Sequence, residues 1–123
     1  MKMIRSAIVL TFAVVLLSAG AAKAADTETI FKFYCVQCHG AAGNGDGPNV
    51  SPDFPVTPRN FNKADEMGKL TDLDIKNVIK EGGPSVSKSP MMPPWGKTLT
   101  DGEIDGLIVK LRAFCKCTGP AAK

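Results

Sequence analysis

Two cysteines and a histidine near the start of the chain are spaced for one particular chemistry. Cys35, Cys38 and His39 form a Cys-x-x-Cys-His pattern. Two thiols separated by two residues can both add to vinyl groups on one edge of a porphyrin, which gives two thioether bonds. Because the histidine follows directly, its imidazole is held against the iron as the proximal ligand. The pattern therefore predicts one covalently bound c-type haem, with its iron, per chain.

A methionine pair in a proline-rich segment offers a second ligand for that iron. Residues 82–98 contain Met91 and Met92, flanked by three prolines. Methionine sulfur is a neutral ligand, and His/Met ligation raises the reduction potential of a haem. Proline stiffens such a loop because its ring fixes φ. We expect one of the pair to bind the iron. Met67 is the remaining alternative, and a methionine that merely fills a gap in the core is the plainer interpretation.

The first residues of the chain have the pattern of an export signal. Lys2 and Arg5 precede an uncharged apolar run over residues 7–17, and a small-x-small cleavage site ends at Ala24. This predicts a secretory signal peptide over residues 1–24 and delivery to the periplasm. The apolar run is shorter than the roughly 20 residues of a membrane span, so an uncleaved anchor is disfavoured.

The net charge of +3 belongs to that leader. Lys2, Arg5 and Lys23 lie in it without an acidic residue, so twelve basic and twelve acidic residues remain in the predicted mature chain, residues 25–123. This balance lacks the basic footprint of a nucleic-acid-binding protein. The length is that of a single domain. A domain of this size has a small core, and a haem would add a large apolar surface on which side chains could pack.

The first predicted helix spans residues 27–38, with Asp26 and Thr27 as candidate N-caps, and it ends at Gly40. The loop that follows, residues 40–62, is long for a small domain and contains four prolines. We expect this loop to wrap around the porphyrin. Its apolar side chains that can face the ring are Val50, Phe54, Val56 and Phe61.

Two further helices are predicted from capping boxes and apolar spacing. One begins at Thr71, with Asp74 three residues on, and ends at residues 82–84; its apolar face would be Leu70, Leu73, Ile75, Val78 and Ile79. The other begins at Thr100, with Glu103 three residues on. Its apolar stripe, which we interpret as core packed on Ile30 and Phe31, is Ile104, Leu107, Ile108, Leu111 and Phe114. No strand pattern is visible, which predicts an all-α fold.

In their order along residues 27–114, these motifs resemble the class I, monohaem cytochromes c of the short bacterial type. The resemblance implies the cytochrome c fold, in which three main helices and long loops wrap around one covalently bound haem. It rests on Ile30-Phe31 before the haem motif, on Gly45-Asp46-Gly47-Pro48, on Pro58-Arg59-Asn60-Phe61, on Met92-Pro93-Pro94-Trp95-Gly96 and on Leu99-Thr100-Asp101-Gly102-Glu103-Ile104.

The resemblance also implies roles for single residues. In this family the sixth ligand is the methionine directly before a proline, which favours Met92 over Met91. A proline in the loop after the haem motif accepts a hydrogen bond from the proximal imidazole through its carbonyl, which here would be Pro48. Arg59 and Trp95 match residues that often reach the haem propionates. A solvated charge and ordinary pocket packing are the plainer interpretations of these two.

A second cysteine pair, Cys115 and Cys117, departs from the family pattern. Three interpretations compete: a local disulfide in an oxidising compartment, a disulfide to another chain, or a four-sulfur zinc site made with Cys35 and Cys38. The zinc site would leave His39 and the methionine segment unexplained, so a disulfide is favoured. Were the pair reduced and exposed, it could be reactive.

With His39 and Met92 both bound, the iron would have no open position for a substrate. We therefore predict a soluble periplasmic electron carrier rather than an enzyme, which meets a redox donor and acceptor near an exposed haem edge, without nucleic acid or stable membrane insertion. Lys88 and Lys97 could steer an acidic partner, or they are ordinary solvated lysines. The alternatives are a haem enzyme or small-ligand-binding protein with a labile methionine, and a four-cysteine zinc module.

Overall fold

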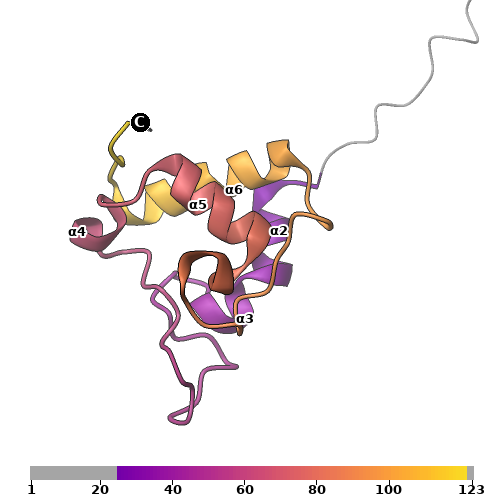
Figure 1. The fold of residues 1–123 in the computed structure, drawn as a ribbon, viewed down its shortest axis with the longest axis vertical. Helices are drawn as coiled ribbons and strands as arrows, with labels where there is room; N and C mark the ends of the chain where they lie inside the picture. Colours follow the sequence, from indigo (N-terminus) through magenta and orange to yellow (C-terminus); the bar gives the residue numbers. More distant parts are fainter. Residues whose placement is uncertain (1–24, 122–123) are drawn as a thin grey trace, which may run out of the picture.

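Three helices form the framework of the molecule: α2 (Thr27–Tyr34), α5 (Asp72–Glu81) and α6 (Asp101–Cys115) (Figure 1). The computed structural model describes residues 25–121, and no strand occurs among them. The predicted all-α fold is therefore confirmed. The predicted signal peptide, residues 1–24, lies outside the described residues. Within 25–121, no helix combines the length and the apolar character that a membrane crossing requires.

The first predicted helix is interrupted at Cys35. α2 ends one residue before it, and a short α3 (Val36–His39) follows, with Cys35 at φ −112° between the two. Asp26 caps α2 as expected, because its carboxylate accepts the backbone N–H of Thr29 at 3.0 Å. Gly40, at φ +77°, ends α3. Both helix ends were thus predicted, whereas the break at the first cysteine of the haem motif was not.

Both later helices begin with the predicted capping boxes. The hydroxyl of Thr71 accepts the backbone N–H of Asp74 at 3.0 Å, and the Asp74 carboxylate accepts the backbone N–H of Thr71 at 2.8 Å. Thr100 and Glu103 form the same reciprocal pair at the start of α6. Each box satisfies backbone donors that the first turn of a helix leaves unpaired. Gly82, at φ +82°, ends α5 where its sequence predicts.

These capping carboxylates make the stability of the fold sensitive to acid. Hydrogen bonds from the hydroxyl and the backbone of Thr71 lower the pKa of Asp74, and those from the backbone and the hydroxyl of Thr100 lower the pKa of Glu103. A folded-state pKa below the unfolded one adds stability above the unfolded value, about 4, and that stability disappears as the pH falls through the folded pKa.

We therefore expect the free energy of unfolding, measured by urea titration, to decrease below about pH 4. The decrease should be smaller in the double variant Asp74→Asn, Glu103→Gln, because its amides keep hydrogen-bonding capacity and do not titrate. Equal acid sensitivity of the two proteins would contradict the assignment to the capping boxes.

The core lies where α2 and α5 each pack against α6. Ile104 of α6 is completely buried, and the ring of Phe31 in α2 lies 5.5 Å from that of Phe114 in α6. The predicted packing of the third helix on the first is therefore confirmed. Leu73, predicted for the buried face of α5, is 51% exposed. It lies two residues before buried Ile75, and helix positions two apart do not face the same side.

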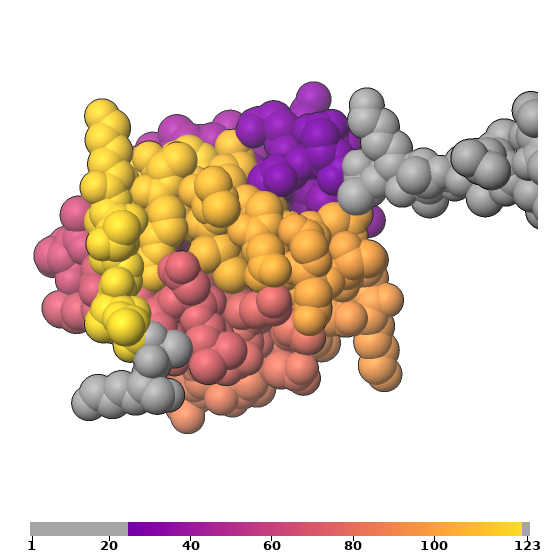
Figure 2. Space-filling view, turned by 90° about the horizontal axis from the view of Figure 1, so that it is seen from above, coloured from indigo at the N-terminus to yellow at the C-terminus, as the bar shows by residue number. Residues whose placement is uncertain are grey.

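Two short helical segments were not predicted, α4 (Ala64–Met67) and the 3-10 helix η1 (Gly83–Val86). α4 brings Met67 into the core, where its side chain is 1% exposed. Because Met67 stands in a polar stretch of sequence, its burial in the core could not be predicted from the pattern of apolar residues. Figure 2 shows the C-terminal part of the chain, orange to yellow, beside segments from the middle of the chain, in agreement with the contacts of α6 with α4 and α5.

Candidate haem-binding site

A cavity of about 700 Å³ lies between the end of the long loop, α5 and the methionine segment. This volume falls within the roughly 300–1,000 Å³ typical of ligand and cofactor pockets. The haem motif contributes Cys38 and His39 to its lining, and the methionine segment contributes Met91 and Met92. Apolar and aromatic side chains make up much of the remaining wall, among them Tyr34, Phe54, Val56, Phe61, Ile75, Val78, Ile79, Trp95 and Leu111.

The long loop contributes most of the apolar side chains that we expected from it. Phe54, Val56 and Phe61 line the cavity, while Val50 is not among the lining residues. Phe61 is also buried in the core and stacks on the ring of His39, with the ring centroids 4.5 Å apart and an interplanar angle of 19°. One aromatic side chain thus supports both the core and the imidazole.

The imidazole of His39 is oriented by the backbone. Its Nδ1 lies 3.2 Å from the carbonyl oxygen of Arg59. Because a carbonyl can only accept, Nδ1 carries the proton in this contact, and Nε2 keeps a lone pair that is available to a metal. Burial lowers the pKa of His39, an effect that the hydrogen bond to Arg59 partly opposes. The neutral imidazole, which is the form that binds a metal, is therefore favoured at neutral pH.

Pro48 does not occupy the position predicted for it beside this imidazole. Three backbone N–H groups of residues 45–49 donate to the carbonyls of residues 37–39, so this part of the loop lies along the backbone of the haem motif. Pro48 is exposed there and is not among the residues that line the cavity. The hydrogen-bond partner of His39 is instead the carbonyl of Arg59. No pattern of side chains identifies a carbonyl partner of this kind.

The two cysteines of the haem motif are partly buried free thiols. Cys38 lines the large cavity, and Cys35 lines a smaller one that shares His39, Met92 and Trp95 with it. Burial, with a further contribution from Cys38, raises the pKa of the Cys35 thiol to about 11. The fold therefore brings both sulfurs to the same apolar region as the imidazole, which fits the chemistry of two thioether bonds and one nitrogen ligand.

The three candidate methionines differ in how they are held, although all three line the large cavity. Met91 is 51% exposed, and Met67 is buried in the core. Met92 is half-buried, lines both cavities, and has its carbonyl bound by the backbone N–H of Gly83 at 2.9 Å. A Cβ on Gly82 would approach that carbonyl to 2.8 Å, so glycine allows the close backbone contact that positions Met92.

Arg59 and Trp95 both line the large cavity. The Arg59 guanidinium donates to the carboxylate of Glu66 across 2.7 Å, at a partly exposed position. Trp95 packs on Tyr34, with ring centroids 4.8 Å apart, and its backbone N–H donates to the carbonyl of Ile79 at 2.9 Å. The sequence did not point to Glu66 or Tyr34. Tyr34 directly precedes the haem motif, and this was the only signal that could have identified it.

The second cysteine pair has no part in this site. Cys115 and Cys117 are joined to each other, so of the two kinds of disulfide that the sequence left open, the local one is present. Because each sulfur has already formed its bond, the four-sulfur zinc interpretation is wrong. Between residues 25 and 121, no group of three or more His, Cys, Asp or Glu side chains is arranged to hold a metal ion.

Comparisons with known proteins agree with this geometry. A family model described as cytochrome c oxidase, cbb3-type, subunit III matches residues 22–109. No curated protein matches the chain. The solved KustC0563 c-type cytochrome is 30% identical, with a TM-score of 0.57, over 72% of this chain and 96% of its own.

A second solved structure comes from the Kuenenia stuttgartiensis reducing HAO-like protein complex Kustc0457/Kustc0458. It is 26% identical to this chain, with a TM-score of 0.60, over 79% of this chain and 47% of its own. The present chain thus spans about half the length of that neighbour.

Proposed function

Because the chain belongs to the cytochrome c family matched by the cbb3-type subunit III model, we propose that it carries single electrons through one c-type haem attached at Cys35 and Cys38. One observation carries this proposal: thiol, imidazole and thioether groups from segments far apart in the sequence line the same apolar cavity. When bound there, the haem iron would supply a one-electron couple between its ferric and ferrous states.

We propose that His39, through Nε2, and Met92, through its sulfur, would bind the iron. Arg59 holds the proton on Nδ1 of His39 through its carbonyl, and Phe61 supports the face of the ring. The loop around Met92 is held by two backbone hydrogen bonds: the Met92 carbonyl accepts the N–H of Gly83, and the Met92 N–H donates to the carbonyl of Ser89. Two residues held in this way would remain the iron ligands in both oxidation states, so each electron transfer would require little rearrangement of the protein.

The proposed cellular role is that of a periplasmic carrier, with residues 1–24 acting as a cleaved signal peptide. Redox proteins would serve as its donor and acceptor and would dock beside the cavity. Lys88 lines the cavity and is exposed, and Lys97 is exposed on the other side of the methionine segment. Both are free to orient an acidic partner during encounter. Arg59 and Trp95 remain the proposed contacts for the haem propionates.

Spectroscopy of protein made in a host that attaches haem tests the proposal directly. We expect a pyridine haemochrome assay to give one haem per chain, with the pigment retained by the denatured polypeptide after acid extraction. The oxidised protein should show the weak long-wavelength band of a sulfur–iron bond. The variant Cys35→Ser, Cys38→Ser is the control, because it should release its pigment on extraction. A wild-type protein that loses all colour in this step would overturn the proposal.

A further inference from the structure

The Cys115–Cys117 disulfide joins the end of α6 to the C-terminal segment. In a continuing helix, residues two apart point to different sides. Lys116 has a left-handed conformation, at φ +49°, and ends the helix. The chain therefore turns back, and the Cα atoms of the two cysteines come within 5.1 Å, a separation that a disulfide can bridge.

The two sulfurs of this disulfide have different surroundings. Cys115 is 7% exposed, and its Sγ lies 3.4 Å from the carbonyl of Arg112 and 3.8 Å from that of Cys117. Cys117 is partly exposed and stands between exposed Lys116 and Thr118, in the segment that Figure 2 shows in yellow on the surface. An external thiolate can therefore reach Cys117 more readily than Cys115.

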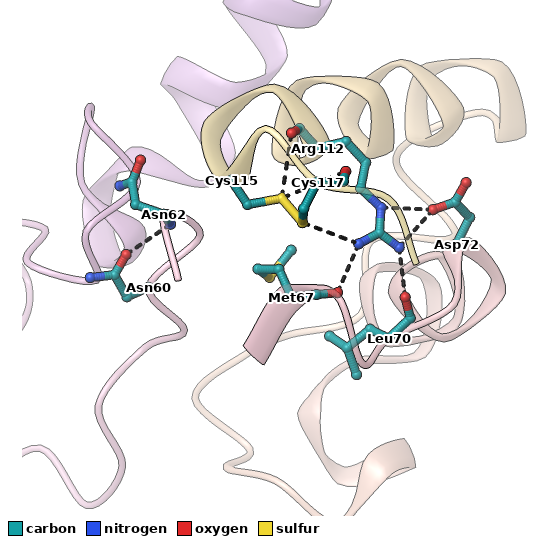
Figure 3. The surroundings of a disulfide bond; sticks show 8 residues. All are labelled: Asn60, Asn62, Met67, Leu70, Asp72, Arg112, Cys115 and Cys117. Atoms are coloured by element: carbon teal, nitrogen blue, oxygen red, sulfur yellow. Dashed lines mark hydrogen bonds and ion pairs between the residues drawn. A yellow bond between two sulfur atoms is a disulfide. The ribbon is translucent and has the colours of Figure 1, made fainter. Parts of the chain in front are cut away.

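A fixed positive charge lies beside the more accessible sulfur (Figure 3). Nη1 of Arg112 is 4.0 Å from Sγ of Cys117. The guanidinium is held by the carbonyls of Met67 and Leu70, at 2.8 and 2.6 Å, and by the carboxylate of Asp72 at 2.8 Å. Its side chain is only 12% exposed, so water screens its charge weakly.

Once the disulfide is reduced, the surroundings of the two sulfurs favour different protonation states. A guanidinium stabilises a thiolate, which favours the charged form of Cys117. The two carbonyls beside Cys115 can only accept hydrogen bonds, so they favour its protonated thiol. Asp72 offsets part of the guanidinium charge, but its side chain is 68% exposed and well hydrated. Cys117 is thus the sulfur suited to form and to leave a mixed disulfide.

We propose that the Cys115–Cys117 pair is a thiol-exchange site for a dithiol protein, separate from the haem site. A thiolate of the partner bonds to Sγ of Cys117, and Sγ of Cys115 leaves with the electron pair and takes a proton. The partner's second thiol, on losing its proton to solvent, then attacks the mixed disulfide and releases Cys117 as a thiolate beside Arg112. The partner becomes a disulfide, and its two electrons reside on the reduced cysteine pair.

Single-cysteine variants of the haem-loaded protein test this asymmetry. Cys115→Ser leaves Cys117 as the reactive thiol, and Cys117→Ser leaves Cys115. With 5,5′-dithiobis(2-nitrobenzoate) as the probe at pH 7, we expect Cys117 to react at least about tenfold faster than Cys115. Peptide mapping assigns the modified cysteine, so any reaction at Cys35 or Cys38 is counted separately. Equal rates, or a faster Cys115, would overturn the proposal.

Charge variants in the Cys115→Ser background separate the electrostatic effect from simple exposure. Arg112→Gln should slow the reaction of Cys117 severalfold, and Asp72→Asn should leave it equal or faster, because the guanidinium remains. Circular dichroism verifies that each variant is folded. If Arg112→Gln perturbs the fold, the pH dependence of the rate in the Asp72→Asn protein decides the matter, since it should reveal a Cys117 pKa below that of an ordinary thiol. An ordinary or raised pKa there would contradict the role of Arg112.

The complete protein provides the last test. Without denaturant, dithiothreitol should reduce the disulfide while the far-ultraviolet circular dichroism stays native, and peptide mapping should then find alkylation at both Cys115 and Cys117. Reduction that occurs only at urea concentrations that unfold the protein would show a purely structural disulfide and refute the proposal. Haem content is measured in the same samples, so a failure of the proposed electron carrier would be seen separately.

Discussion

Replacing Met92 with alanine is expected to lower the reduction potential of the haem by more than about 0.1 V, since the identity of the axial ligands moves such potentials over roughly 0.8 V. The loss of the sulfur removes a ligand that favours the ferrous state. It should also open one position of the iron to carbon monoxide. Redox titration followed by optical spectra of the reduced protein with added carbon monoxide measures both effects.

Met91→Ala is the matched control for this prediction. Met91 is the neighbouring residue and also lines the cavity, but it is half-exposed, and its loss should change neither the potential nor the ligand binding. The reverse result would identify Met91 as the ligand. Rapid binding of carbon monoxide to the unaltered protein would favour a small-ligand-binding haem protein over an electron carrier. If neither variant has an effect, Met67 is the remaining candidate.

Phe31→Ala is expected to lower the free energy of unfolding by about 3–5 kcal/mol. The side chain is 1% exposed, and its ring packs against Phe114 and Phe61 at centroid distances of 5.5 and 6.5 Å. The ammonium of Lys110 lies over the same ring, 4.8 Å from its centroid. Removing the ring leaves a cavity where α2 meets α6 and withdraws a support of Phe61, which stacks on His39.

Phe33→Ala controls for the chemistry of this substitution. Phe33 belongs to the same helix but is 71% exposed, so its replacement should change stability by no more than about 0.5 kcal/mol. Urea unfolding of the haem-loaded proteins, followed by circular dichroism, compares the two. Similar losses in both variants would mean that the core between α2 and α6 has been assigned wrongly.

The helices were predictable because their signals are local. A capping box such as Thr71 with Asp74 needs residues only three apart, and these satisfy the same backbone groups in any surroundings. The apolar stripe that begins at Ile104 depends only on helical spacing. Leu73 shows the limit of such spacing, since an apolar residue at the edge of a stripe remains exposed when no neighbouring element covers it.

The haem motif was predictable for a similar reason. Attachment of a c-type haem requires two cysteines and a histidine within five consecutive residues, so Cys35, Cys38 and His39 can be recognised as candidates without a fold. Met92 was suggested by the prolines around it and by the family resemblance. Its half-buried position, in contrast with the exposure of Met91, depends on how the segment closes against Gly82.

The amino-acid order alone specified which groups can react and where the helices begin and end, because those properties belong to single residues and near neighbours. Three features depend on the tertiary structure: the carbonyl that accepts the hydrogen bond of His39, the burial of Met67, and the proximity of Cys117 to Arg112. Each of these contacts joins a side chain to a backbone group or to a distant element. Such pairings depend on the path of the chain through space, for which no individual residue carries a signature.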